Sequence, residues 1–247
     1  MAMGDIRSRH ANTSLGLLWW VLSPLLLGLV YLLVFGVILN TRRGDPNYIG
    51  FLLSGLFAFY YTSQSLTAGS TSLLSNSRLV STTWFPRLIL PIAAIIEGAI
   101  GFMSSLIPFF LIAGLVNGDW PGWHTFLLIP ILILHTMFNL GLACLFGLLA
   151  IPFRDVSNLL PYLNRVWLYT SPVIFPIDER VKNASDTLYF ILSLNPLASI
   201  LGFYRAALLG RELTAAMVIG ATAWGFGLLV IGVTLFIRNE PRLARYL

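Results

Sequence analysis

The feature that most constrains this chain is a series of long stretches without a charged side chain. Leu15 to Leu39 holds 25 residues with no Asp, Glu, Lys or Arg, and His124 to Ile151 holds 28. About 20 apolar residues in a helix suffice to cross the hydrocarbon core of a bilayer. Only 10% of all residues are charged, against about 25% in soluble domains. The sequence therefore predicts an all-α membrane protein.

The charge-poor runs predict six transmembrane helices in one membrane domain covering residues 1–247. The predicted spans are 22–39, 48–71, 89–116, 124–151, 159–175 and 215–237. The opening run is too long for one upright span, so we expect an amphipathic interfacial helix over residues 1–20 and a break near Pro24. One tilted helix with an aromatic belt at Trp19 and Trp20 is the alternative.

Two further segments are predicted to hold short helices outside the spans. Residues 176–212 are too polar to span and too apolar to be a free linker, so we expect re-entrant or gate helices at 188–194 and 197–209 on the outer side. Residues 75–87 follow the second span, with a capping residue at Asn76 or Ser77 and a stop at Pro86. This cytoplasmic segment is interpreted as a coupling helix that contacts a partner, or else as an amphipathic turn resting on the bilayer.

The basic residues predict that both termini are cytoplasmic, because cytoplasmic loops carry an excess of Lys and Arg. With the N-terminus inside, nine basic residues are cytoplasmic and six are outside. The inner set is Arg7, Arg9, Arg78, Arg87, Arg154, Arg165, Arg238, Arg242 and Arg245, and the outer set is Arg42, Arg43, Arg180, Lys182, Arg205 and Arg211. Because the net charge of +5 is spread over these short loops, it does not indicate nucleic-acid binding.

The sequence excludes several kinds of chemistry. A phosphate-binding loop needs Gly-x-x-x-x-Gly-Lys, and the only lysine, Lys182, has no glycine nearby. His124 and His135 are eleven residues apart, about 16 Å on a helix, too far to share a metal, and each is interpreted as an interfacial anchor. We therefore expect no catalytic activity, no metal and no cofactor in this chain.

The second span carries the most informative pattern. Phe57, Tyr60, Tyr61 and Gln64 follow i, i+3, i+4, i+7 spacing and so share one helix face. Aromatic and polar side chains on one face suit a passage in which sugar rings stack on aromatic rings; ordinary helix packing is the alternative. The full set of predicted channel-lining residues is Tyr31, Phe35, Phe57, Phe59, Tyr60, Tyr61, Gln64, Trp167 and Tyr169.

One acidic residue lies deep within a predicted span. Glu97 is about ten residues inside the third span, near the middle of the membrane. A carboxylate at that depth is functional or paired by default. Arg165 in the fifth span is the candidate partner, and a packing role for Glu97 is the alternative.

A series of short motifs resembles the membrane subunits of ABC-2 polysaccharide exporters of the Wzm type. The matching segments, in order along the chain, are 15–20, 24–25, 53–57, 85–87, 90–91, 153–156, 171–176 and 194–197. Each is weak alone, but their order covers most of the chain. The family often has lysines before Phe85–Pro86–Arg87, where this chain has Ser81–Thr82–Thr83–Trp84.

The resemblance implies a permease subunit that exports a polyprenyl-pyrophosphate-linked polysaccharide such as O-antigen, teichoic acid or galactan. It implies a homodimer in the bacterial cytoplasmic membrane, with ATP and Mg²⁺ bound by two copies of a separate ATPase. The chain has one lysine and 14 arginines, which suggests a GC-rich genome and so favours an actinobacterial galactan exporter. Arg7 and Arg9 would meet the lipid head group, and the coupling residues would be Asn76, Arg78, Leu79, Trp84, Phe85 and Arg87.

Two other functions stay open at this point. A permease of the same architecture could export a drug or a free lipid. An ATP-independent channel or a membrane enzyme would need a buried catalytic set or a filter motif, and we find neither in the sequence.

Overall fold

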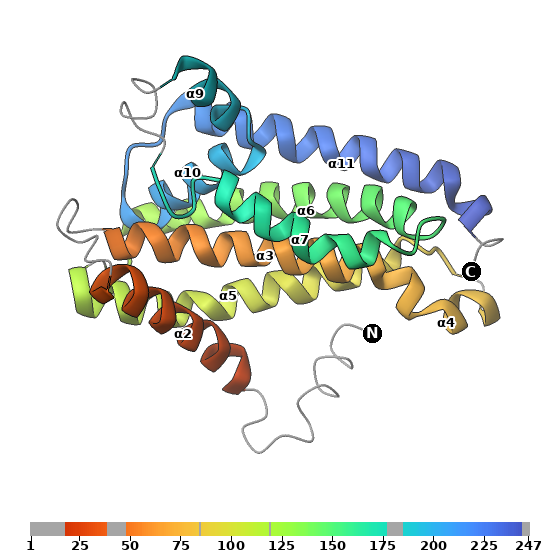
Figure 1. Cartoon of the computed structure of the whole chain (residues 1–247), viewed down its shortest axis with the longest axis horizontal. Helices are drawn as coiled ribbons and strands as arrows, with labels where there is room; N and C mark the ends of the chain where they lie inside the picture. Colours follow the sequence, from red (N-terminus) through yellow and green to blue (C-terminus); the bar gives the residue numbers. More distant parts are fainter. Residues whose placement is uncertain (1–17, 39–47, 84, 119, 177–184, 244–247) are drawn as a thin grey trace.

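The computed structural model describes residues 18–38, 48–83, 85–118, 120–176 and 185–243, and every regular element in these ranges is a helix (Figure 1). The predicted all-α class is confirmed for this part of the chain. The helices are α2 (Trp19–Tyr31), η2 (Leu32–Ile38, a π-helix), α3 (Tyr48–Ser75), α4 (Ser77–Thr82), α5 (Ile89–Asn117), η4 (Trp123–Leu127, a 3₁₀-helix), α6 (Leu128–Ala150), α7 (Val156–Thr170), α9 (Asp186–Ser193), α10 (Pro196–Leu209) and α11 (Ala215–Leu243).

Three helical stretches among the described residues are long and apolar enough to cross a bilayer. They are Ile89–Leu115, Trp123–Ala150 and Ala215–Glu240, which correspond to the third, fourth and sixth predicted spans. The other three predicted spans correspond to α2 with η2, to α3 and to α7. The total of six spans stays a prediction.

The first helix differs from the prediction. The helix that begins at Trp19 runs through Pro24 and continues as η2 to Ile38, without the expected break. Proline is tolerated inside membrane helices because neighbouring groups satisfy the carbonyl that loses its partner. Residues 1–17 of the predicted interfacial helix lie outside the described residues.

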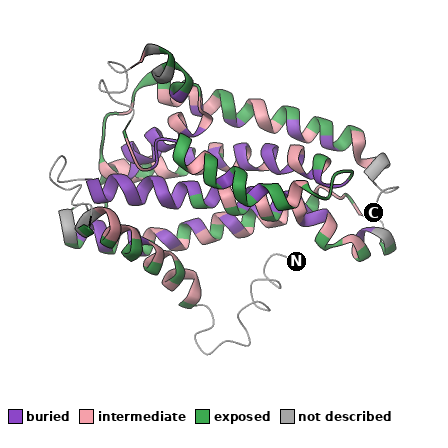
Figure 2. Cartoon of the chain, viewed as in Figure 1, coloured by how far each residue is buried: buried purple, intermediate pink, exposed green. Residues whose placement is uncertain are grey.

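Helix α3 is the centre of the bundle. It packs against α5, α6, α7 and α10, and residues Tyr48–Phe59 are all buried (Figure 2). This packing explains how a helix rich in Ser, Thr and Gln fits an apolar fold: most of its surface meets protein. Because α3 is central, the residues on its face are well placed to form a site.

Helices α6 and α11 make the most extensive helix pair. A Cβ atom added to Gly141 would lie 2.2 Å from the carbonyl oxygen of Leu228, and one added to Gly232 would lie 2.3 Å from the carbonyl oxygen of Gly141. Glycine at these positions lets the two backbones approach closely, a common way to pack membrane helices.

Helix α7 ends at Thr170, five residues before the predicted end of the fifth span. Pro172 disfavours helical backbone at the residue before it. Ser171 is accordingly extended, with φ −95° and ψ 152°. The chain leaves the helix here and turns toward α9 and α10.

Helix α10 is a core element. Asn195 caps its start by accepting from the N–H of Leu197, Pro196 occupies the first turn, and Gly210 ends it with φ 64°. Most of its side chains are buried against α3, α6, α11 and η4. The predicted short helices at 188–194 and 197–209 correspond to α9 and α10, and their role as re-entrant or gate helices stays a prediction.

The structure corrects the predicted position of Arg205, which the sequence placed among the basic residues of the outer loops and which lies on α10. Its side chain is only 6% exposed. Its Nη2 atom donates to the carbonyl oxygen of Pro172 at 2.5 Å and lies at 3.4 Å from that of Val173. Carbonyl oxygens and an aromatic ring replace water around the guanidinium, which is why a loop-like position in the sequence becomes a buried one.

The opposite end of the bundle brings α4 and the end of α11 together (Figure 1). The backbone N–H of Arg87 donates to Oε1 of Glu240 at 2.9 Å, and its Nη1 atom donates to the carbonyl oxygen of Glu240 at 2.8 Å. We call this end of the bundle, which holds α4, Arg87 and Glu240, the α4 end. The Arg87–Glu240 contact fixes the segment after α4 to the last helix.

Candidate functional site

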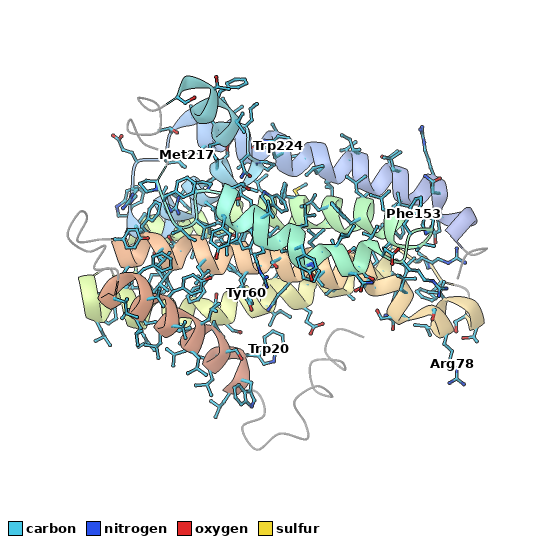
Figure 3. All side chains as sticks on the ribbon, in the orientation of Figure 1. Trp20, Tyr60, Arg78, Phe153, Met217 and Trp224 are labelled. Atoms are coloured by element: carbon cyan, nitrogen blue, oxygen red, sulfur yellow. The ribbon has the colours of Figure 1, made fainter. Side chains whose placement is uncertain are left out.

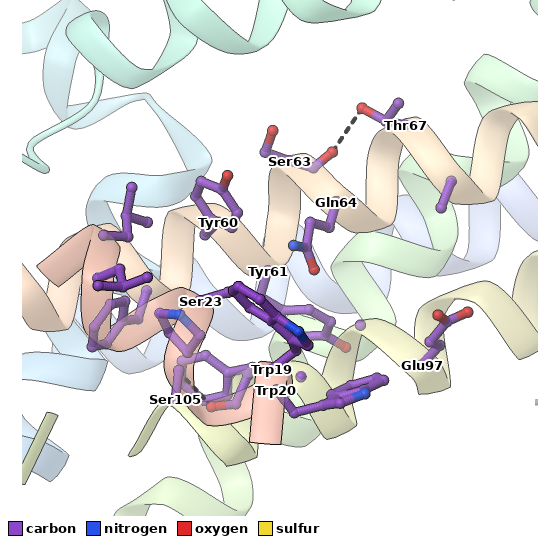
Figure 4. Close-up of a pocket in the computed structure, with 18 of the residues that line it drawn as sticks. Trp19, Trp20, Ser23, Tyr60, Tyr61, Ser63, Gln64, Thr67, Glu97 and Ser105 are labelled. Atoms are coloured by element: carbon purple, nitrogen blue, oxygen red, sulfur yellow. Dashed lines mark hydrogen bonds between the residues drawn. The ribbon is translucent and has the colours of Figure 1, made fainter. Parts of the chain in front are cut away.

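A cavity of about 830 Å³ lies between α2, α3 and α5 (Figure 4). Aromatic rings come from all three helices, and hydroxyl, amide and carboxyl groups lie among them. The lining residues are Trp19, Trp20, Ser23, Pro24, Leu26, Leu27, Val30, Phe57, Tyr60, Tyr61, Ser63, Gln64, Thr67, Ala68, Ala94, Glu97, Gly98, Gly101, Phe102 and Ser105.

The structure brings together the predicted face of the second span. Phe57, Tyr60, Tyr61 and Gln64 all line the cavity, since 3.6-residue periodicity places them on adjacent turns of α3. Their exposure differs: Phe57 is 3% exposed, Tyr61 2% and Tyr60 45%. Tyr60 therefore presents its ring at the edge, while Phe57 and Tyr61 form the wall.

Tyr61 is held by a hydrogen bond behind the cavity wall. Its hydroxyl lies 2.9 Å from Oγ1 of Thr136 on α6, and its ring stacks on Phe102 of α5 with centroids 5.8 Å apart. Gly98 leaves room for this ring, because an added Cβ would lie 3.1 Å from it. The packing fixes the orientation of Tyr61.

The remaining predicted aromatic residues do not line this cavity. Tyr31 and Phe35 stack on each other at 5.9 Å and pack against Tyr48 and its neighbours. Phe59 is buried in the main core. Trp167 and Tyr169 lie on α7: Trp167 donates from Nε1 to Oδ1 of Asn195 at 3.2 Å, and Tyr169 is 62% exposed.

Glu97 and Arg165 lie in different places. Glu97 lines the cavity from α5, whereas Arg165 is exposed on α7. Among the described residues no hydrogen bond or ion pair joins the two side chains. The predicted contact between Glu97 and Arg165 is therefore not observed. Glu97 lies in the wall of the cavity instead.

A buried polar cluster links α3, α6 and α10. His135 is fully buried, with Nε2 2.6 Å from Oγ1 of Thr62 and Nδ1 3.2 Å from the hydroxyl of Tyr204. It is thus not an interfacial anchor, as its sequence position suggested. The signal that was available is the spacing of His135 and Asn139, which places two polar side chains on one face of an otherwise apolar helix.

His124 occupies a different environment from His135. Its Nδ1 atom lies 2.9 Å from the carbonyl oxygen of Ala207. This contact ties η4 to the end of α10. No group of three His, Cys, Asp or Glu side chains that could hold a metal is found in the described part of the chain.

The predicted coupling residues divide into anchored and exposed ones. Arg78 is exposed, and its side chain points away from the bundle at the α4 end (Figure 3). Leu79 and Phe85 pack into a small core with Val80 and Phe236, and Arg87 binds Glu240. Asn76 donates from Nδ2 to the carbonyl oxygen of Ser72 at 2.8 Å.

Three predicted site residues cannot be placed. Trp84, Arg7 and Arg9 lie outside the described residues. Their roles in coupling and in lipid head-group entry stay predictions.

Comparison with known proteins identifies the family. Residues 1–209 match the ABC-2 type transporter family. The chain is 29% identical to the O-antigen export system permease protein RfbA of Myxococcus xanthus over 82% of this chain and 76% of that protein. It is 26% identical to RfbA of Klebsiella pneumoniae, over 98% of this chain and 92% of that protein.

A third relative is named for a different substrate. The chain is 25% identical to the polysialic acid transport protein KpsM of Escherichia coli, over 83% of this chain and 78% of that protein. These relatives cover most of the length of the chain, and the family match extends from its first residue into α10. The chain belongs to the ABC-2 type transporter family.

Proposed function

We propose that this chain is the permease subunit of an exporter that moves a lipid-linked polysaccharide across the bacterial cytoplasmic membrane. Two copies of the chain form the passage, and two copies of a separate ATPase bind ATP with Mg²⁺ and drive transport. The chain itself carries no catalytic activity. The observation that carries the proposal is the aromatic and hydroxyl-bearing cavity beside α3 in a member of this family.

The cavity favours a saccharide over an apolar cargo. Lipid and drug sites are mostly apolar, with few polar groups. Here eight side chains bring polar groups among the rings. Seven carry a hydroxyl or amide group, Ser23, Tyr60, Tyr61, Ser63, Gln64, Thr67 and Ser105, and Glu97 carries a carboxyl group. Sugar rings need both a flat apolar surface and hydrogen-bond partners, and this wall supplies both.

Two exposed apolar helix faces support the homodimer. On α2 and η2 the exposed residues follow helical spacing and are Leu26, Leu29, Val30 and Leu33. On α7 they are Leu159, Tyr162, Leu163, Val166 and Tyr169. In the proposed dimer these faces meet the second copy, and the exposed Tyr60 ring is then available to the passage.

The α4 end is the proposed docking surface for the ATPase. Arg78 of α4 and Phe153 of the turn after α6 are both exposed there, Phe153 by 65% (Figure 3). Aromatic side chains and arginine are enriched at protein interfaces. With this end cytoplasmic, both termini are cytoplasmic and Arg7 and Arg9 approach the pyrophosphate head group.

Co-purification from the native membrane tests the class of the protein. We expect a polypeptide of ATPase size in equal amount, and ATP hydrolysis only when it is present. Replacement of Trp84 by Asp should abolish export while the chain still assembles. Unchanged export by this variant would overturn the docking assignment.

Depletion of the chain tests the cargo. We expect a polyprenyl-pyrophosphate-linked polymer, such as galactan, O-antigen or teichoic acid, to accumulate on the cytoplasmic side. Accumulation of a drug or of a free lipid instead would overturn the proposed cargo and favour the alternative permease.

A further inference from the structure

Helix α7 packs on α3 and ends beside the start of α10 (Figure 1). We propose that α7 pivots about Asn195 during export, and that Asn195 is a positioning residue: it fixes the end of α7 to α10 while the middle of α7 moves away from the cavity wall on α3. This inference rests on the proposed function, because it concerns the transport step.

All four hydrogen-bonding positions of the Asn195 side chain are used. Its Oδ1 atom accepts from Nε1 of Trp167 at 3.2 Å and from the N–H of Leu197 at 3.1 Å. Its Nδ2 atom donates to the carbonyl oxygen of Thr170 at 3.2 Å and to Oγ of Ser171 at 3.0 Å. A side-chain amide offers two donors and two acceptor positions, so none is left over. We call this set of contacts the α7–α10 joint.

The contact between α7 and α3 is weaker than the α7–α10 joint. Asn164 lies three residues before Trp167, on the same face of α7. Its Nδ2 atom donates to Oγ1 of Thr67 at 3.1 Å and to the carbonyl oxygen of Ser63 at 3.4 Å, and both α3 residues line the cavity (Figure 4). Its Oδ1 atom is buried and accepts no hydrogen bond from the described residues, which costs free energy. The amide of Asn164 thus uses half of its capacity.

Apolar packing also holds α7 less firmly than α10. Only Leu160 and Asn164 of the 15 residues of α7 are buried, against ten of the 14 residues of α10. Segments with few buried apolar contacts open locally at a low cost in free energy. We therefore expect α10 to stay in place and α7 to swing, with the contact at Asn164 opening before the α7–α10 joint.

The backbone changes conformation at the α7–α10 joint. Ser171 is extended, with φ −95° and ψ 152°, and precedes Pro172. Hinges are commonly a few residues at the end of a helix that absorb a rotation. Two of the sequence segments that carry the family resemblance, 171–176 and 194–197, meet at this point through Ser171 and Asn195.

Two pairs of cysteine substitutions test the pivot in the full chain assembled with its ATPase. The pair Ser171→Cys and Asn195→Cys lies at the α7–α10 joint, and the pair Thr67→Cys and Asn164→Cys lies at the cavity wall. The two native side chains are joined by a hydrogen bond of 3.0 Å in the first pair and 3.1 Å in the second, so one short, reducible bis-methanethiosulfonate reagent suits both. The one native cysteine, Cys144, is buried.

The readout is polymer export per ATP hydrolysed, measured before the reagent, after it and after reduction. We expect the unlinked cysteines at positions 171 and 195 to lower this ratio at least about threefold, because the joint is lost. The cross-link should restore the ratio. Across positions 67 and 164 the cross-link should instead abolish export, and reduction should restore it. Each of the four single substitutions, treated with the same reagent, is the control.

Amide hydrogen exchange of the purified chain tests the joint without any cargo. Asn195→Leu keeps a side chain of similar size and removes all four hydrogen bonds. Exchange of residues 166–171 should rise at least about tenfold, because the end of α7 is released. Asn158→Leu, the same change at an exposed position of the same helix, is the matched control and should leave this exchange unchanged.

Each adverse outcome has a distinct meaning. Unchanged exchange in Asn195→Leu overturns the joint, whatever the exporter transports. Faster exchange together with an unaltered export ratio overturns its role in export. Full export with positions 67 and 164 cross-linked overturns the movement at the cavity wall, and this arm stays decisive if the Asn195 variants do not fold. If depletion of the chain leaves no polymer on the cytoplasmic side, the proposed function fails, and hydrogen exchange still decides whether the joint exists.

Discussion

The guanidinium of Arg205 lies over the ring of Phe51, with Cζ 3.5 Å from the ring centroid. The same group donates to the carbonyl oxygen of Pro172 at 2.5 Å. Three segments far apart in sequence therefore meet at one side chain: the start of α3, the turn after α7, and α10. A cation–π contact and carbonyl dipoles together replace the water that a buried cation loses.

Replacing Arg205 by Lys should destabilise the protein although the charge is retained. Lysine has a compact ammonium on a flexible stem and cannot reproduce the planar fork, so the carbonyl of Pro172 loses its donor. We expect a loss of about 2–3 kcal/mol, measured by thermal unfolding of the purified chain. Arg154→Lys, at an exposed site, should stay within about 0.5 kcal/mol. Equal stability of the two variants would contradict the structural role of Arg205.

Gly55 leaves the space that Arg205 occupies. A Cβ added at Gly55 would lie 2.8 Å from Nη2 of Arg205 and 3.3 Å from the backbone of Val173. Gly55→Ala should therefore displace the guanidinium and cost about 1–3 kcal/mol of stability. Gly227 is the matched control, because nothing lies within 4 Å of its added Cβ. Gly227→Ala should be neutral or slightly stabilising, and equal effects of the two substitutions would contradict the predicted clash.

Local patterns in the sequence predicted the parts of the structure that depend on neighbours along the chain. The face that joins Phe57 to Gln64 follows from helical periodicity alone. The end of α7 at Thr170 could also have been predicted, because Pro172 disfavours helical backbone at the residue before it and this effect is local. Proline was misjudged twice, as a break at Pro24 and as harmless at Pro172, and α3 and α11 run past the predicted ends at 71 and 237 to Ser75 and Leu243.

Burial of polar side chains was not predicted, because their partners are distant in sequence. Arg205 contacts Pro172 and Phe51, which are 33 and 154 residues away, and His135 contacts Thr62, 73 residues away. A single sequence does not show which helices pack together. For the same reason the predicted pair Glu97–Arg165 was not found.

Tyr60 and Tyr61 should respond differently to loss of their hydroxyl groups. Tyr61 donates its proton to Thr136 inside the bundle, so Tyr61→Phe should lower stability by about 1 kcal/mol. Tyr60 is 45% exposed, and Tyr60→Phe should change stability by less than about 0.5 kcal/mol. Thermal unfolding of the two variants compares them directly, and the reverse order would contradict the position of Tyr61 in the wall.

Removal of the two rings tests their role in transport. Replacing Tyr60 and Tyr61 by Ala should reduce polymer export more than ATP hydrolysis by the assembled exporter. We expect this because sugar rings can no longer stack on these aromatic rings, while the α4 end is unchanged. Equal losses of export and hydrolysis would indicate that the rings serve packing alone.

The contact between Arg87 and Glu240 predicts that Glu240→Gln is milder than Glu240→Ala. The carboxylate of Glu240 accepts from the backbone N–H of Arg87, while the guanidinium binds the backbone carbonyl of Glu240. Glu240→Gln keeps an acceptor oxygen and should retain the ATPase and export, whereas Glu240→Ala leaves the N–H without it and should cost about 1–2 kcal/mol. The α4 end would then loosen from α11, and less ATPase should co-purify with the Ala variant. A charge-dependent ion pair would instead make Gln as damaging as Ala, so co-purification with the Gln variant decides between the two.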